Sequence, residues 1–157
     1  MRELDGSLFG DDQPCFGCGP KHPFGFRLRF REEEGAIVTR FMPGEAHQGP
    51  PGVMHGGLVF TLADELAAWA VIVGLGKFGF TVRFSGKLQR PVRPGVDLEG
   101  RADIPRQAGR TCDVEVRLSQ KGEPVFSGTF VFAVLDTAAA EKLLGRPLPE
   151  AWRKFAR

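Results

Sequence analysis

One long apolar segment, residues 57–73, limits the possible folds of this chain most strongly. Its length and its Leu and Ala content predict a helix, and Gly74 and Gly76 are expected to end it. The segment is apolar on nearly every side, which is typical of a helix that other elements surround. The sequence has no second helix of that length, so a single helix must pack against whatever sheet the rest of the chain forms.

Strands are predicted wherever apolar and polar residues alternate with a period of two. Two such segments precede the helix and four follow it: residues 24–31, 36–41, 78–89, 96–104, 112–119 and 126–134. A short helix from Asp136, as N-cap, to Gly145 follows, and another is expected after Pro149. The order β-β-α-β-β-β-β predicts an α+β fold in which an antiparallel sheet curls around one long central helix.

The length of 157 residues suits a single domain, 1–157, with an N-terminal segment 1–22 and a helical tail 136–157. The net charge of +2 argues against nucleic acid or an acidic membrane surface as the main partner. Asp64 and Glu65 interrupt the apolar segment and argue against a transmembrane helix. The N-terminus lacks the pattern of a signal peptide, and three cysteines form no disulfide framework, so a cytoplasmic location is expected.

The residues most suggestive of chemistry lie where a Gly/Pro-rich loop enters the helix. Gly56 and Gly57 allow close approach to the backbone, and the first N–H groups of a helix lack internal partners. Such a site suits an anion or a carbonyl oxygen that gains charge during a reaction. The alternative interpretation is that the two glycines only tighten a turn.

Asp64 adds an acid to this region. A carboxylate on a buried helix is costly unless it is paired or lies beside a cleft that water enters. Gly57 and Asp64 share one helix face but lie about 10 Å apart, too far for one reacting carbon to contact both. Two antiparallel helices from two chains would bring Gly57 and Asp64 together, which favours a dimer with two shared sites. Alternatively, Asp64 is only a satisfied polar residue, or Glu65 is the working acid.

The run His55-Gly56-Gly57 followed by Asp64 resembles the hotdog-fold acyl-CoA thioesterases of the PaaI-like and THEM4-like groups. The order of elements from Pro14 to Leu135 is similar to that of the same fold. The resemblance implies hydrolysis of an acyl-CoA thioester without a cofactor, by a homodimer or a dimer of dimers.

The resemblance also implies roles for single residues. The Gly57 N–H, with Gly56, would polarise the thioester carbonyl, and Asp64 of the facing subunit would act as nucleophile or as general base. Thr81, near the start of the next strand, would position the water or the acid. Gln48 stands where many members have an Asn in the loop, and His55 is expected to hold that loop by a hydrogen bond rather than to transfer protons.

Substrate contacts are predicted from charge and position. Lys87, Arg90 and Arg93 are candidates to bind the phosphates of coenzyme A, although a solvated surface cation is the stronger interpretation for each. Glu65 is assigned to substrate binding. Phe78, Phe80 and Phe84 could line an acyl tunnel, but alternating phenylalanines on a strand are more often core residues.

Cys15 and Cys18 form a Cys-x-x-Cys knuckle with His22 nearby. A structural zinc site usually has four ligands, and no second Cys-x-x-Cys is present, so no metal site is predicted. Redox chemistry is disfavoured because no thioredoxin-like context surrounds the knuckle. Cys112 lies on the apolar face of a predicted strand and is assigned to the core.

Two other functions remain open. The first is an acyl-CoA-binding or sensing protein that uses the same pocket without cleavage. The second is a hydratase of the same fold, which should carry an Asp and a His about five residues apart ahead of the helix, and that pattern is absent from the sequence. A serine hydrolase is excluded because the sequence has no Gly-x-Ser-x-Gly.

Overall fold

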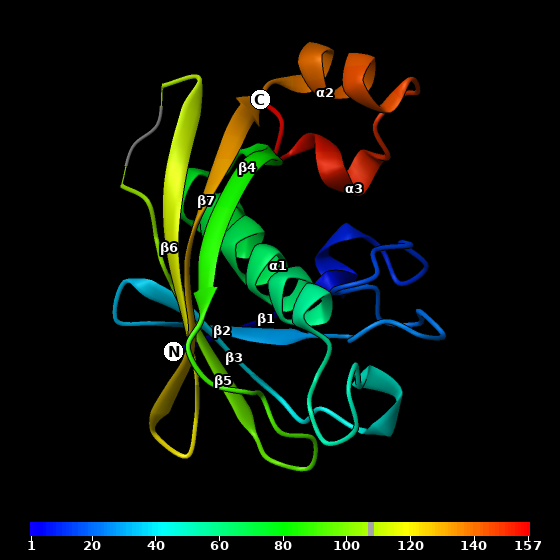
Figure 1. Cartoon of the computed structure of the whole chain (residues 1–157). Helices are drawn as coiled ribbons and strands as arrows, with labels where there is room; N and C mark the ends of the chain where they lie inside the picture. The colour runs from blue at the N-terminus through cyan, green and yellow to red at the C-terminus, as the bar shows by residue number, and fades with distance from the viewer. Residues whose placement is uncertain (107–108) are drawn as a thin grey trace.

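The computed structural model describes residues 1–106 and 109–157. An antiparallel seven-stranded sheet curls around one long helix, α1 (Gly56–Leu75), with strand order β1-β2-β3-β5-β6-β7-β4 (Figure 1). The strands are β1 (Arg2–Asp5), β2 (Arg29–Glu33), β3 (Ala36–Phe41), β4 (Phe78–Leu88), β5 (Leu98–Asp103), β6 (Thr111–Gln120) and β7 (Glu123–Leu135). The shorter helices are α2 (Thr137–Leu144) and α3 (Glu150–Arg153), with 3-10 turns η1 (Gly6–Phe9) and η2 (Glu45–His47). The predicted α+β architecture is confirmed.

Helix α1 forms the centre of the core. Its buried residues are Val59, Leu62, Ala63, Leu66, Ala67, Trp69, Ala70 and Val71. By length and mean hydropathy α1 could cross a membrane, but here it contacts β3, β4, β5, β6 and β7. The helix is capped by Gly76, which has a left-handed φ of 59° and donates its N–H to the Ile72 carbonyl. Gly74 does not end the helix as predicted, because it lies inside it, where a Cβ would come within 2.3 Å of Ile104 Cγ2.

The prediction for the first strand is wrong in its first half. Strand β2 begins at Arg29, because Arg27 has a φ of 51° and takes the backbone out of the extended conformation. The Phe26 and Leu28 N–H groups instead donate to the carbonyls of Phe16 and Gly17, at 3.0 and 2.9 Å. Alternation continues through this bend, so the pattern alone did not reveal it.

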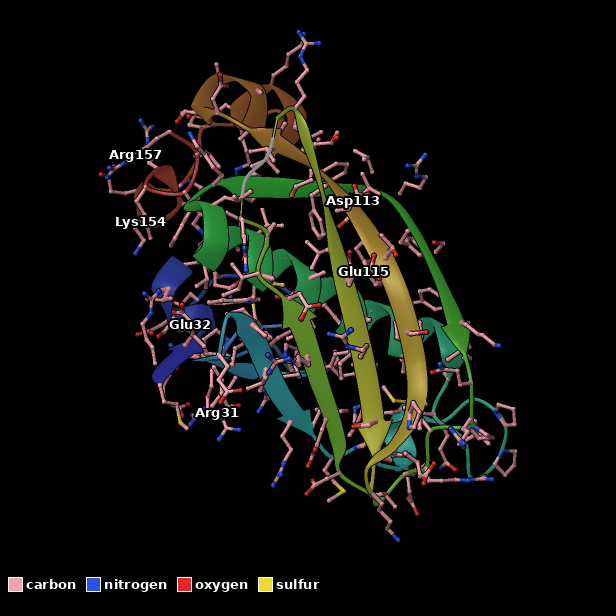
Figure 2. All side chains as sticks on the ribbon, turned by 90° about the vertical axis from the view of Figure 1, so that its left-hand side faces the viewer. Arg31, Glu32, Asp113, Glu115, Lys154 and Arg157 are labelled. Atoms are coloured by element: carbon pink, nitrogen blue, oxygen red, sulfur yellow. The ribbon has the colours of Figure 1, made fainter. Side chains whose placement is uncertain are left out.

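Strand β1 is an addition to the predicted order. It pairs with β2 in antiparallel register, from Arg2 opposite Glu32 to Asp5 opposite Arg29. Its four residues are too few and too polar to show an alternation signal. All other boundaries lie within three residues of the prediction. Strand β6 shows the alternation clearly, with Asp113 and Glu115 pointing outward and Val114 buried between them (Figure 2).

Strand β4 is one edge of the sheet, and among residues 1–106 and 109–157 it pairs with β7 alone. Four of its apolar side chains are 46–55% exposed: Phe80, Val82, Phe84 and Leu88. A β-bulge between Thr81 and Arg83 shifts its register against β7. Edge strands of this length with exposed apolar side chains are unusual unless another chain covers them.

Helix α2 packs on β7, and helix α3 packs on η1 of the N-terminal segment. The Asp136 side chain caps α2 by accepting from the Ala139 N–H, and Gly145 ends the helix in the left-handed conformation, as predicted. Trp152 of α3 donates its indole N–H to the Phe9 carbonyl at 3.1 Å. Its ring also packs on the Phe9 ring, with centroids 4.8 Å apart. Phe9 in turn contacts the Trp69 ring of α1, with centroids 5.7 Å apart, so the tail packs on η1 and η1 on the central helix.

Candidate active site

His55 forms the N-cap of α1. Its Nδ1 accepts a hydrogen bond from the Gly57 N–H at 3.0 Å, and its carbonyl accepts from Leu58 and Val59. The His55 N–H in turn donates to the His47 carbonyl at 2.9 Å, which ties the helix start to the preceding loop. His55 therefore links the loop to the first turn of the helix.

The two glycines differ in how their N–H groups are used. Gly57 is exposed, but its N–H is already donated to His55. The Gly56 N–H has no hydrogen-bond acceptor among residues 1–106 and 109–157. A Cβ on Gly57 would lie 3.1 Å from the His55 ring, so the turn is compact on that side. One helix N–H is thus open to a ligand, and a second becomes open if the His55 ring turns away.

Asp64 lies two turns along α1 and forms a pair with Thr81 of β4. The Thr81 hydroxyl donates to Asp64 Oδ1 at 2.6 Å. The β-bulge directly after Thr81 is a local irregularity of the kind that re-aims side chains near active sites. Burial raises the pKa of the Asp64 carboxyl, and the hydrogen bond from Thr81 partly offsets this rise. The pair therefore combines a partly desolvated acid with a positioned hydroxyl.

A cleft of about 590 Å³ contains this pair. Its lining comes from the first turns of α1, from β4 and from one residue of β7: Gly57, Phe60, Thr61, Asp64, Thr81, Val82, Arg83, Phe84 and Phe130. Three of the predicted catalytic residues, Gly57, Asp64 and Thr81, therefore share one surface. Another hollow, of about 470 Å³, is lined by residues of β2, β3, β5, β6 and β7, and none of these three residues lines it.

The side chains of Gln48, Arg90 and Arg93 form hydrogen bonds with backbone groups outside the cleft. Gln48 Oε1 accepts from the Gly52 N–H at 2.7 Å, so its side chain closes the loop before α1. Arg90 and Arg93 donate to the carbonyls of Pro124 and Gly52, at 2.7 and 3.1 Å. Lys87 is exposed on β4 and forms no ion pair within the described part of the chain. Of the three cations, Lys87 is the one whose side chain donates no hydrogen bond within the described part of the chain.

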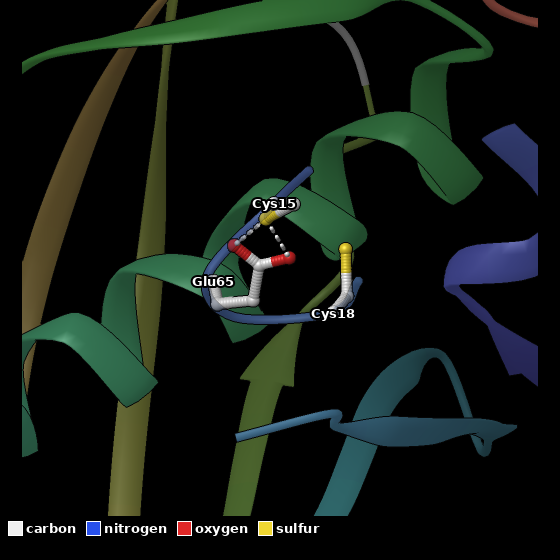
Figure 3. Close-up of side chains that lie close together, drawn as sticks. All are labelled: Cys15, Cys18 and Glu65. Carbon is white, nitrogen blue, oxygen red and sulfur yellow. Dashed lines mark hydrogen bonds between the residues drawn. The ribbon is translucent and has the colours of Figure 1, made fainter. Parts of the chain in front are cut away.

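Glu65 does not line the cleft that contains Asp64, and its assignment to substrate binding stays a prediction. Successive helix residues point about 100° apart, and Glu65 faces the N-terminal knuckle instead. The Cys15 thiol donates to both of its carboxylate oxygens at 3.4 Å (Figure 3), and the Trp69 indole N–H donates to Oε1 at 3.3 Å. Burial, and secondarily the Cys15 sulfur, raises the pKa of Glu65 to about 8. Of the two adjacent acids, it is Asp64 that lines this cleft.

For Phe78, Phe80 and Phe84 the sequence left open whether they line a tunnel or belong to the core. Phe84 lines the cleft and packs against Phe60 and Phe130, with centroids 5.3 and 5.8 Å apart, so it is not an ordinary core residue. Phe78 lies at the far end of β4 against Trp152. Arg83 was missed, because its contribution to the cleft depends on the bulge that no sequence signal announces.

Comparison with known proteins links this geometry to one family. Residues 51–127 match the model of the thioesterase superfamily, and this range includes His55, Gly57, Asp64 and Thr81. No curated protein sequence matches the chain.

Solved structures support the same architecture. A hypothetical thioesterase from Streptococcus pneumoniae TIGR4, solved with coenzyme A, is 24% identical with a TM-score of 0.63 over 68% of this chain and 87% of that one. The protein smu.793 from Streptococcus mutans UA159, bound to acetyl CoA, is 20% identical with a TM-score of 0.61 over 68% and 87%. Zebra fish thioesterase superfamily member 2 is 22% identical with a TM-score of 0.64 over 73% and 88%. These similarities establish a shared fold.

Proposed function

Since residues 51–127 place this chain in the thioesterase superfamily, and its fold is the hotdog fold, we propose that the protein hydrolyses an acyl-CoA thioester. The products are a free carboxylic acid and coenzyme A. The observation that carries the proposal is the Asp64–Thr81 pair, which lies in one cleft with the open N-terminus of α1. The two structures solved with coenzyme A or acetyl CoA support this substrate class.

The thioester oxygen would bind at the start of α1. Backbone N–H groups at a helix N-terminus stabilise an oxygen that gains negative charge in the transition state. The Gly57 N–H supplies this stabilisation together with Gly56. In the structure the Gly57 N–H donates to His55 Nδ1, so the thioester oxygen would have to replace this nitrogen as the acceptor of the Gly57 N–H.

Asp64 supplies the attack on the thioester carbon by one of two routes. As a general base it takes a proton from water, whose oxygen forms the new C–O bond while the C–S bond breaks. As a nucleophile it forms an anhydride with the acyl group, which water then opens to the free acid. In both routes coenzyme A leaves as a thiolate that takes up a proton. Thr81 orients the Asp64 carboxylate, or the water beside it, through its hydroxyl.

The spacing along α1 favours a site that two copies of the chain share. Gly57 and Asp64 lie about 10 Å apart on the same helix, whereas reacting atoms must approach within about 3.5 Å. A second copy that covers the exposed edge strand β4 would place its own Asp64 opposite Gly57. The exposed side chains of Phe80, Val82 and Phe84 favour this edge as the interface. We therefore propose a homodimer with two shared sites, with a dimer of dimers as a further arrangement.

One observation favours a second candidate, which is binding of acyl-CoA without cleavage. The Gly57 N–H is occupied by His55, so the site as it stands offers a substrate oxygen only the Gly56 N–H. A protein that never releases this hydrogen bond would bind the ligand and fail to activate it. Tight binding with no turnover would support this candidate.

Thiol release from a panel of acyl-CoAs separates the two candidates. The wild type, Asp64→Asn and the control Asp113→Asn are compared, because Asp113 is an exposed carboxylate on β6 that does not line the cleft. We expect turnover by the wild type and Asp113→Asn, and loss of at least about 100-fold in kcat for Asp64→Asn. Unchanged turnover in Asp64→Asn would remove Asp64 from the mechanism, and no turnover by the wild type on any substrate would refute hydrolysis.

A further inference from the structure

The N-terminal knuckle and the central helix bring three metal-binding side chains together. Cys15 and Cys18 come from the loop before β2, and Glu65 comes from α1, fifty residues after Cys15 (Figure 3). Their sulfur and oxygen atoms all lie within 4.8 Å of one another. None of these three residues belongs to the cleft that contains Asp64.

The separation of Cys15 and Glu65 fits two ligands of a tetrahedral ion, and the Cys18 sulfur lies within 4.8 Å of both. Zinc binds thiolate sulfur at about 2.3 Å and carboxylate oxygen at about 2.0–2.2 Å, which places neighbouring sulfur and oxygen ligands about 3.6 Å apart. The Cys15 sulfur lies 3.4 Å from each Glu65 oxygen. An ion between these ligands therefore requires side-chain shifts of only a few tenths of an ångström for this pair.

Surrounding contacts hold the knuckle in this arrangement. A Cβ on Gly17 would lie 2.5 Å from Glu65 Cγ and Cδ, so only glycine lets the loop approach the carboxylate so closely. The buried Gln13 accepts from the Cys15 N–H at 2.8 Å and donates to the Cys18 sulfur at 3.5 Å. Hydrogen bonds to ligands and to their loop are typical of the outer shell of metal sites.

In the described part of the chain, no lysine, arginine or histidine forms an ion pair with Glu65. Cys18 is buried, and Cys15 and Glu65 are partly buried, so the deprotonated form of this cluster is costly unless a cation neutralises it. Metal ions bind thiols and carboxyls in that deprotonated form, with release of their protons. A divalent ion would therefore supply the positive charge that the surrounding side chains do not.

We propose that Cys15, Cys18 and Glu65 bind one zinc ion whose fourth coordination position opens into the neighbouring cavity. Two sulfur ligands favour zinc over magnesium or calcium, which prefer oxygen. The cavity has a volume of about 170 Å³ and is lined mostly by apolar side chains, including Phe9, Trp69 and Trp152. A water molecule completes the tetrahedron there. The ion would join the N-terminal segment to α1 at the residue next to Asp64.

Zinc content of the purified, reduced full-length chain tests the proposal directly. The protein is stripped of metal, incubated with zinc and freed of unbound ion, and the bound zinc is measured by mass spectrometry. The matched control is Cys112→Ala, because Cys112 is buried on β6 and is not part of the cluster. We expect one zinc per chain in the wild type and in Cys112→Ala, almost none in Cys18→Ser, and at least a tenfold weaker affinity in Glu65→Gln. Equal binding by Cys18→Ser and the wild type overturns the proposal.

A second measurement on the wild type alone avoids any folding defect of the variants. The rates at which a thiol reagent alkylates Cys15 and Cys18 are measured with zinc, with magnesium and with neither ion. Zinc should slow alkylation of both residues at least tenfold, and magnesium should not. Equal rates with and without saturating zinc overturn the proposal. Recovery of Cys15 and Cys18 as a mutual disulfide from protein prepared with zinc overturns it as well.

Discussion

The hydroxyl of Thr81 can be removed with little change of shape by the substitution Thr81→Val. In the structure this hydroxyl donates to Asp64 Oδ1 at 2.6 Å across the cleft. Both side chains are partly buried, so water replaces the lost hydrogen bond only in part. The substitution therefore leaves the acid in place and removes the group that orients it.

The expected loss follows from the strength of this contact. A hydrogen bond to a charged partner contributes about 1.5–3 kcal/mol. If the Thr81–Asp64 bond is fully expressed in the transition state, kcat/KM falls by about 10- to 150-fold. The fall should lie in kcat rather than in KM, because the contact positions the acid and does not bind the substrate.

The assay is steady-state thiol release from the acyl-CoA that the wild type cleaves best. Thr129→Val is the matched control, because Thr129 also donates its hydroxyl to a carboxylate, that of Glu115, at 2.7 Å, but on an exposed surface outside the cleft. Thr129→Val should keep kcat and KM within about twofold of the wild type, as surface substitutions usually do. The double variant Asp64→Asn/Thr81→Val should be no slower than Asp64→Asn alone, because Thr81 acts through Asp64.

Two results would refute this reasoning. A kcat for Thr81→Val within twofold of the wild type would show that the hydrogen bond does not support the reaction. A rise in KM at constant kcat would show that Thr81 contacts the substrate instead of positioning Asp64.

Two further predictions concern assembly and stability. Phe84→Glu places a charge on the exposed edge strand and should raise the dimer dissociation constant at least about tenfold. Light scattering would detect this as a fall from the dimer mass, twice 17.2 kDa, to the mass of one chain. A variant that stays fully dimeric would contradict β4 as the interface. Gly74→Ala should lower the free energy of unfolding, measured by urea denaturation, by about 1–3 kcal/mol. The reason is that the new Cβ would lie 2.3 Å from Ile104 Cγ2, although alanine is normally the better helix former. A more stable variant would show that this contact relaxes.

Local patterns in the sequence predicted most of the architecture. The apolar run before Gly76 predicted α1, and alternation predicted six of the seven strands, because burial of one face imposes a period on the residues that form it. The capping role of Asp136 was equally visible, since it depends on residues next to it. The sequence also indicated that Gly57 and Asp64 share one face of α1, and both residues line the cleft.

Elements whose formation depends on distant partners were not predictable in this way. Strand β1 is recognised by its pairing with β2, and the bend at Arg27 by the bonds that residues 26 and 28 make to the knuckle. The bulge after Thr81 likewise arises from the register of β4 against β7. These features depend on which segments hydrogen-bond to one another through their backbones. An alternation of apolar and polar residues does not identify the partner segment.

The two adjacent acids of the central helix separate what the sequence predicts from what only the tertiary structure decides. The sequence by itself determined that α1 is long and apolar and carries two adjacent acids, Asp64 and Glu65. Only the tertiary structure decided that the first faces the cleft with Thr81 and the second faces Cys15 in another environment. The physical reason is that neighbouring helix residues point about 100° apart, so their surroundings are set by the elements packed on each face of the helix.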